Sequence, residues 1–309
     1  MTMGLTVLFM DSPPLPHSST TFWWYSIGEV LLLLLTIAQS WRTLNAWARS
    51  FLIQRRDRRL PLAVSPSSSS ATPTVAVAMA VYNGEKFLVE QIQSILNQSH
   101  PHLHLYIRDD GSSDASRDLL RRLQERHPER ITLIEDGESQ LGVIGNFQRV
   151  LTFIKEWGKE SYICLADQDD VWFTDKVATT LARLQITELW KGAASPVLVH
   201  SNLCVVDANL GVMDPSFWYC QHLDPGKDDL RELCLQNMVT GCTVMMNKAL
   251  LEKALPIPSA ALMQDWWLAL VAFCFWHNSV HAPTHCDVST VRENRYVGGK
   301  IQLWGMLFA

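Results

Sequence analysis

Several features that would place the protein in a narrow class are missing from its sequence. The seven cysteines are scattered between Cys164 and Cys286, their number is odd, and no two of them form a CxxC pair. We therefore expect reduced, mostly buried thiols, and neither a disulfide framework nor a cysteine-based zinc site. The net charge of −5 lacks the basic excess of a general nucleic-acid binder, so we expect no nucleic-acid partner.

Lysine and arginine are also absent from the first 21 residues, which precede a strongly apolar stretch. This stretch, residues 22–41, has Glu29 as its only charge and is close to the length of about 20 residues that crosses a bilayer. Arginines follow it up to residue 59, and the positive-inside rule then predicts a cytoplasmic location for the rest of the chain. Residues 1–59 are therefore predicted to hold one membrane-associated helix. A helix lying in the membrane interface, or packed on the domain, is the alternative, because a carboxylate at mid-span is costly.

Two further regions complete the predicted organisation. Residues 60–73 are uncharged and rich in serine and proline, and they are predicted to be a flexible linker. Residues 74–309 then form one domain, in which short apolar runs alternate with segments of helical spacing. The predicted strands are 74–81, 103–107, 131–134, 162–165 and 197–200, and the predicted helices between them include 85–98 and 114–126. This alternation predicts an α/β fold with a mostly parallel, doubly wound sheet.

Carboxylates cluster directly after the predicted strand 162–165. Asp167, Asp169 and Asp170 lie within four residues, and like charges at this density are costly unless a cation lies among them. Oxygen ligands of this kind select Mg²⁺ or Mn²⁺, which usually also bind phosphate oxygens. Asp167 and Asp169 are two residues apart in an extended segment, so both should point to the same side. The alternative is a solvated acidic loop, although the apolar pair that follows favours an anchored segment.

A second pair of carboxylates, Asp109 and Asp110, follows the second predicted strand. A carboxylate at such a strand end can hydrogen-bond the base or the ribose of a nucleotide. The alternative is structural, because Ser112, Ser113 or Asp114 could be the N-cap of the next helix. Both roles can coexist, and Asp114 is then expected to be the structural residue.

Five motifs, in this order, resemble those of a known family. They are VYNGEKFLVEQIQSILNQ from Val81, YIRDDGSSD from Tyr106, LADQDDVW from Leu165, TGC from Thr240 and QDWWLAL from Gln264. With these motifs the chain resembles family-2 glycosyltransferases of the GT-A fold, and most of all their bacterial rhamnosyltransferase-like branch. The resemblance covers residues 74 to about 299. It implies a sugar transferase that uses a nucleotide-sugar donor.

The resemblance also implies where the donor binds. Its nucleotide would contact Tyr82, Asn83, Asp109, Asp110, Gly142, Asn146 and Asp167. Among these, Tyr82 and Asp110 would contact a uracil or thymine base. The turn at residues 141–147 resembles a loop that closes over the nucleotide, and an ordinary helix start at Gly145 and Asn146 is the alternative there.

Two motifs would supply the metal site and the catalytic base. Asp167 and Asp169 would form the DxD element, which binds the ribose and, through Mg²⁺ or Mn²⁺, the diphosphate, while Asp170 would extend this acidic edge. Asp265 matches the general base of inverting members, which takes the proton of the acceptor hydroxyl as it attacks the anomeric carbon. The N-cap of an aromatic helix is the alternative for Asp265. The histidine that completes the family's metal site is absent from the matching segment, where Glu293 is a further candidate ligand.

The sequence thus predicts an inverting, metal-dependent glycosyltransferase at the cytoplasmic face of a membrane. It would act on a glycan or lipid-linked acceptor, with a UDP- or dTDP-sugar as donor, and the resemblance favours dTDP-rhamnose. One alternative is a catalytically impaired member that binds the nucleotide-sugar without turnover, because the metal-site histidine is missing. A sugar nucleotidyltransferase is a further alternative, but it needs a glycine-rich, basic phosphate loop after the first strand, where this chain has only Gly84 and Lys86.

Overall fold

The computed structural model describes part of the chain, namely residues 72–192, 194–224, 230–277 and 294–297. The chain divides into two compact units, residues 1–68 and 69–309, and every described residue lies in the second. The predicted membrane helix 22–41 and most of the predicted linker 60–73 lie outside the described residues. Within the described ranges, no helix is both long enough and apolar enough to cross a bilayer.

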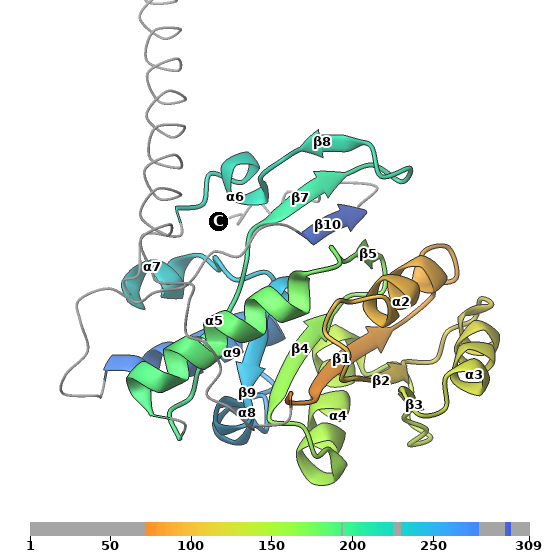
Figure 1. Cartoon of the computed structure of the whole chain (residues 1–309), viewed down its shortest axis with the longest axis horizontal. Helices are drawn as coiled ribbons and strands as arrows, with labels where there is room; N and C mark the ends of the chain where they lie inside the picture. Colours follow the sequence, from red (N-terminus) through yellow and green to blue (C-terminus); the bar gives the residue numbers. More distant parts are fainter. Residues whose placement is uncertain (1–71, 193, 225–229, 278–293, 298–309) are drawn as a thin grey trace, which may run out of the picture. The chain divides into compact units, whose positions relative to one another are not determined.

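A six-stranded sheet forms the centre of the described domain, in the order β3-β2-β1-β4-β9-β6 (Figure 1). Its strands are β1 (Val75–Val81), β2 (Leu103–Asp109), β3 (Ile131–Leu133), β4 (Tyr162–Ala166), β6 (Leu198–Val199) and β9 (Met245–Asn247). The first four run parallel to one another, whereas β9 is antiparallel to both β4 and β6. The predicted α/β fold with a mostly parallel sheet is thereby confirmed.

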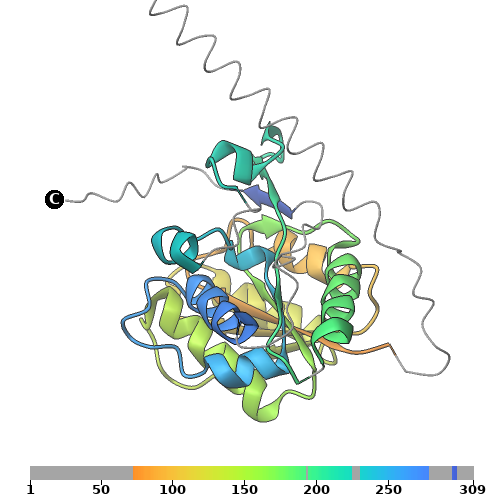
Figure 2. The same cartoon turned by 90° about the vertical axis from the view of Figure 1, so that its left-hand side faces the viewer.

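Helices cover both faces of this sheet (Figure 2). They are α2 (Leu88–Leu96), α3 (Ser116–Arg126), α4 (Gly142–Trp157), α5 (Lys176–Lys191), α8 (Lys248–Ala254) and α9 (Gln264–His277). Strand β1 shows the two layers, since Val75, Val77 and Met79 pack with α2, α3 and α5. Ala76 and Ala78 point the other way and pack with α4, α8 and α9. A strand buried on both faces has a continuous apolar sequence. For this reason the apolar sequence of β1 predicted a central parallel strand.

A second, smaller sheet has the strand order β5-β10-β7-β8. Its strands are β5 (Asp170–Val171), β7 (Leu203–Val206), β8 (Val212–Asp214) and β10 (Asn294–Val297), and the short helices α6 (Phe217–Cys220), α7 (Leu230–Leu235) and η1 (Gly241–Thr243) follow between β8 and β9. The sequence did not predict this sheet, because strands of two to four residues are too short for a periodic signal. Its strand β5 begins at Asp170, so the acidic motif is fixed at one end by strand pairing.

The carboxyl ends of β1, β2 and β4 meet at one edge of the central sheet. Val81 at the end of β1 stands opposite Asp109 at the end of β2, and Met79 stands opposite Ala166 at the end of β4. The polar clusters that follow these strands are therefore neighbours in space, as the parallel arrangement predicts. This edge holds the candidate site.

Candidate active site

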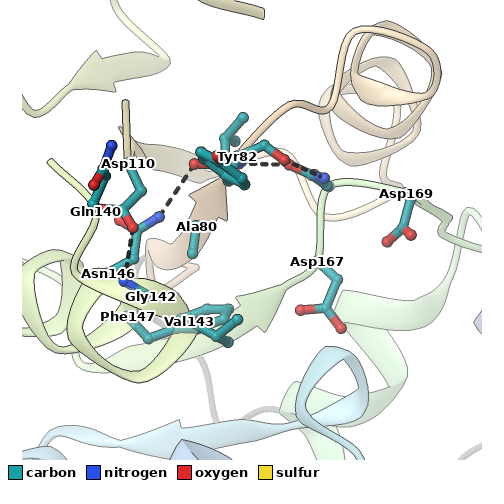
Figure 3. Close-up of a pocket in the computed structure, with 12 residues that line it drawn as sticks. Ala80, Tyr82, Asp110, Gln140, Gly142, Val143, Asn146, Phe147, Asp167 and Asp169 are labelled. Carbon is teal, nitrogen blue, oxygen red and sulfur yellow. Dashed lines mark hydrogen bonds between the residues drawn. The ribbon is translucent and has the colours of Figure 1, made fainter. Parts of the chain in front are cut away.

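A cavity of about 640 Å³ opens where β1, β2 and β4 end and α4 begins (Figure 3). It is lined by Ala80, Val81, Tyr82, Asp110, Gln140, Gly142, Val143, Asn146, Phe147, Asp167, Gln168 and Asp169. Most of the residues predicted to bind the nucleotide are among them, namely Tyr82, Asp110, Gly142, Asn146 and Asp167. Asn83 and Asp109 are not among the lining residues.

Gln168, which the sequence did not single out, joins two of the loops around the cavity. The backbone N–H of Tyr82 donates to Gln168 Oε1 over 2.8 Å, and Gln168 Nε2 donates back to the Tyr82 carbonyl over 3.0 Å. This pair of bonds fixes the loop after β1 to the loop after β4. A Cβ atom at Gly84 would lie 2.7 Å from Gln168 Oε1, so the loop needs glycine at this close approach. The Tyr82 ring itself is 53% exposed at the cavity rim.

Asn83 and Asp109 hold the neighbouring loop together. Asn83 has a φ of +50°, its N–H donates to Ser112 Oγ over 2.8 Å, and its Oδ1 accepts from the Ser113 N–H over 2.8 Å. Asp109 accepts from the Ser112 N–H over 2.9 Å and from Arg117 Nε over 2.8 Å. Burial alone would raise the pKa of Asp109, but the Arg117 and Ser112 bonds lower it below its usual value. Their contact with a nucleotide stays a prediction, since the structure gives both side chains a structural task.

Asp114 has the structural role that was expected of it. Its Oδ1 accepts from the Ser116 N–H over 3.0 Å at the start of α3, and its Oδ2 accepts from the Glu85 N–H over 3.0 Å. Glu85 in turn accepts from the Ala115 N–H over 2.9 Å. The loop before α3 is thus tied to the loop after β1.

Asp110 lies on the cavity floor and fixes the beginning of α4. Its Oδ1 accepts from the Leu141 N–H over 3.0 Å, and its Oδ2 accepts from the Gly142 N–H over 2.8 Å. Helix α4 therefore starts at Gly142, and its first turns occupy residues 142–147. The predicted turn over residues 141–147 is wrong, and the helix-start alternative describes this segment, with a start earlier than Gly145, because Asp110 satisfies the first N–H groups.

Arg108 is the second residue that sequence reasoning missed, and its side chain is fully buried. Its guanidinium donates to Asp110 Oδ1 over 3.0 Å, to Asn146 Oδ1 over 3.0 Å, and to both carboxylate oxygens of Asp136 over 2.9 and 3.0 Å. It also donates to the Glu138 carbonyl over 3.0 Å. The signal was present, because an arginine that follows the apolar residues of a central strand must find buried acceptors.

The three carboxylates of the acidic motif differ in their surroundings. Asp167 and Asp169 border the cavity on the same side of their loop (Figure 3). Burial and the charges of Asp169 and Asp265 raise the pKa of Asp167 to about 7. Asp170 is only 1% exposed, no N–H or O–H group of the described residues donates to its carboxylate oxygens, and the Cys242 thiol interacts with it. Burial, with the charges of Asp167 and Asp169, holds the pKa of Asp170 well above its usual value.

A buried ammonium group partly compensates these carboxylates. Lys176 Nζ donates to the Cys242 carbonyl over 2.9 Å and lies 3.4 Å from the ring centroid of Trp172. Burial lowers the pKa of Lys176, while the neighbouring Asp170 and Asp167 act to raise it. Three carboxylates and one ammonium leave a formal charge of −2, which one divalent cation would balance. The buried oxygens of Asp170, to which no N–H or O–H group of the described residues donates, and the hard carboxylate donors both fit Mg²⁺ or Mn²⁺.

Asp265 reaches the same region from a distant part of the chain. It is buried near the start of α9, and its Oδ1 accepts from Asn237 Nδ2 over 3.1 Å and from the Trp266 N–H over 2.6 Å. Burial raises the pKa of Asp265 to about 6. The charge of Asp265 in turn raises the pKa of Asp167, so the two carboxylates lie within electrostatic reach of each other. A base candidate therefore stands beside the acidic motif.

The aromatic pair after Asp265 belongs to the core. Trp266 and Trp267 pack in the hydrophobic cluster beneath α9, and their ring N–H groups donate to the carbonyls of Leu233 and Ala254 over 2.6 and 2.8 Å. Glu293, the further candidate ligand, lies outside the described residues.

Comparison with known proteins finds a matching family model and several similar proteins. Residues 76–200 match the family model of glycosyl transferase family 2. The dTDP-rhamnosyl transferase RfbG of Shigella flexneri is 32% identical over 103 residues, which are 33% of this chain and 35% of that protein. An uncharacterized glycosyltransferase of Nostoc sp. is 28% identical over 188 residues, which are 59% of this chain and 53% of that protein. The matches thus span between about a third and a half of the length of these relatives.

Among solved structures, a match is found with the mannosyltransferase PcManGT from Pyrobaculum calidifontis, in complex with GDP-Man and Mn²⁺. It is 22% identical, with a TM-score of 0.46, and the match covers 75% of this chain and 61% of that one. The family match over residues 76–200 confirms the predicted resemblance to family-2 glycosyltransferases. Asp265 lies beyond the matched residues, so its role as the base stays a prediction.

Proposed function

We propose that the chain is an inverting, metal-dependent glycosyltransferase that moves a sugar from a nucleotide-diphosphate sugar to an acceptor hydroxyl. The observation that carries this proposal is that the cavity and the buried carboxylate of Asp265 come together at Asp167. A cavity of about 640 Å³, within the usual size range of small-molecule pockets, ends at Asp167 and Asp169. Asp265, a buried carboxylate with a raised pKa, stands close enough to Asp167 for their charges to interact.

The nucleotide would lie between the rim at Tyr82 and the floor at Asp110. The exposed Tyr82 ring offers a flat face for a base. Asp110 Oδ2 accepts only the Gly142 N–H among the described hydrogen bonds, so one lone pair is left for a donor. The N3–H of uracil or thymine is such a donor, which supports a UDP- or dTDP-sugar. The ribose and the diphosphate would then point toward Asp167.

Asp167, Asp169 and Asp170 would hold the Mg²⁺ or Mn²⁺ ion. A divalent ion in this place supplies electrostatic stabilisation of the negative charge that develops on the leaving diphosphate. The formal charge of −2 on the three carboxylates and Lys176 matches one such ion. The raised pKa values of Asp167 and Asp170 reflect how unfavourable the ionised cluster is without a cation.

Asp265 would act as the general base. The acceptor oxygen forms a bond to the anomeric carbon while the bond from that carbon to the phosphate oxygen breaks, and the hydroxyl proton passes to the Asp265 carboxylate. Attack from the face opposite the leaving group inverts the anomeric centre. A pKa of about 6 leaves Asp265 ionised at neutral pH and makes it more basic than an ordinary aspartate.

The setting of the reaction is also part of the proposal. The apolar residues 22–41 and the arginines that follow support a membrane-associated chain with its catalytic domain in the cytoplasm. A lipid-linked or growing glycan would then be the acceptor, in polysaccharide or lipid-linked glycan biosynthesis. The similarity to a dTDP-rhamnosyl transferase supports dTDP-rhamnose as the first donor to test.

The test is calorimetric titration of the full-length chain with UDP and dTDP, with and without Mn²⁺, repeated on Asp169→Ala. We expect nucleotide binding that requires both Mn²⁺ and Asp169, followed by slow hydrolysis of the matching nucleotide-sugar. Binding without any hydrolysis over long incubation would favour the catalytically impaired alternative. A folded chain that binds neither nucleotide under any condition would refute the proposed donor site.

A further inference from the structure

A thiol lies among the carboxylates of the proposed metal site. Ligand atoms of Asp167, Asp170 and Cys242 all lie within 4.8 Å of one another. Cys242 comes from η1, far along the chain from the acidic motif, and it is only 1% exposed. Cys242 lies in the TGC motif, but no ligand role was predicted for its thiol, and it was expected to be a core residue like the other six cysteines.

Asp170 provides the second observation. It is 1% exposed, and no N–H or O–H group of the described residues donates to its oxygens, so the Cys242 thiol is the hydrogen-bonding side chain beside it. A thiol is a weak donor, and a buried carboxylate with no stronger partner is costly unless a cation approaches it. The nearby ammonium of Lys176 directs a hydrogen bond to the Cys242 carbonyl instead. The arrangement of two carboxylates and a thiol is compact enough for all three to reach one ion.

We propose that Cys242 is a further protein ligand, beside Asp167 and Asp170, of the divalent ion in the donor site. This inference rests on the proposed function, because it concerns the ion that the transferase would use. On binding, the thiol proton is released to solvent and the sulfur coordinates the ion as a thiolate. One sulfur among oxygen ligands shifts the preference of the site from Mg²⁺ toward more thiophilic ions such as Zn²⁺ and Cd²⁺.

The test uses Cd²⁺ as the probe on the full-length chain. Thiolate coordination gives Cd²⁺ an ultraviolet charge-transfer band, which is measured as a difference spectrum between the parent and Cys242→Ser, so that the other cysteines cancel. We expect Cys242→Ser to lose one thiolate's share of the band. Its Cd²⁺ affinity should fall by at least about tenfold, a loss that even outer-shell partners of a metal can cause. Its Mg²⁺ affinity should change by less than about threefold, because serine keeps an oxygen ligand in place.

The matched control is Cys204→Ser. Cys204 is also a buried cysteine, in β7, and it is not part of the cluster. It should leave both the band and the Cd²⁺ affinity as in the parent. If Cys242→Ser does the same, the thiol is not a ligand and the inference is wrong. If Cys242→Ser does not fold, the cadmium NMR spectrum of the parent decides, because a bound ion with only oxygen-type shifts would overturn the inference.

This outcome can be told apart from failure of the proposed function. Mn²⁺-dependent UDP or dTDP binding of equal affinity in the parent and in Cys242→Ser would leave the transferase proposal intact and remove only the thiol ligand. A parent that coordinates Cd²⁺ through Cys242 but binds no nucleotide would support the thiol site and refute the transferase.

Discussion

Replacing Arg108 by methionine should remove the group that holds together the floor of the cavity. The guanidinium is fully buried and donates to Asp110, Asp136 and Asn146 as well as to a backbone carbonyl. Methionine has a similar length but no donors. The change therefore leaves the packing nearly filled and strips several buried acceptors of their partner.

The size of the effect follows from which acceptors are buried. Asp110 is 5% exposed in its side chain, so its charge would lose its only ion-pair partner among the described residues in a low-dielectric environment. Breaking a buried pair in this way typically costs about 3–5 kcal/mol. The Asp136 partner is 27% exposed and should add little, on the order of 1 kcal/mol or less. A loss of about 3–5 kcal/mol is a large part of the ~5–15 kcal/mol that stabilises a typical domain.

The assay is urea-induced unfolding of the full-length chain in detergent, followed by tryptophan fluorescence. Arg117→Met is the control, because its ion pair with Asp109 involves a half-exposed guanidinium and should be worth less than about 1 kcal/mol. Adding Asp110→Asn to Arg108→Met should recover part of the lost stability, since no unpaired charge then remains. If Arg108→Met costs no more than Arg117→Met, the reasoning about the buried network fails.

Three further predictions concern the reaction and the loops. Asp265→Asn should lower sugar transfer by about 10²–10⁴-fold in a product assay and leave nucleotide binding unchanged, and unchanged turnover would dismiss Asp265 as the base. Because burial raises the pKa of Asp265 to about 6, the basic form is lost as pH falls through that value. kcat/KM should then drop about tenfold per pH unit below it, whereas a flat profile would contradict this assignment. Gly84→Ala should weaken nucleotide binding by about 5- to 30-fold (1–2 kcal/mol), because the added Cβ would displace Gln168 from Tyr82. Calorimetry measures this affinity, and an affinity equal to the parent's would show that the contact between Gln168 and Tyr82 is unimportant for binding.

The sequence predicted the structure best where local patterns of apolar and polar residues agree with the parallel pairing of the strands. The apolar run that became β1 and the polar residues after β1, β2 and β4 were enough to predict the fold and the edge that carries the cavity. Much less could be predicted about β9, because its antiparallel place between β4 and β6 depends on partners about 50–80 residues away. For the same reason, Cys242 and Asp265 could not be placed beside Asp167 by spacing. Only the packing of η1 and α9 brings them there.

The alternation of side chains along a strand would have distinguished Asp109 from Asp110 in the sequence. Successive side chains along a strand point to opposite faces, so Asp110 shares a side with Arg108 and Tyr106, while Asp109 shares a side with Ile107. Tyr106 packs in the cluster under α4 and Ile107 in the cluster on the other face. The alternation along β2 is therefore enough to separate the two carboxylates. Because of this alternation, Asp110 and Arg108 lie on the side of α4 and the cavity. Asp109 lies on the other side, near the loop that Arg117 closes. A carboxylate that shares its face with a buried arginine is the better candidate for the floor of a binding site, because its position is fixed before a ligand arrives.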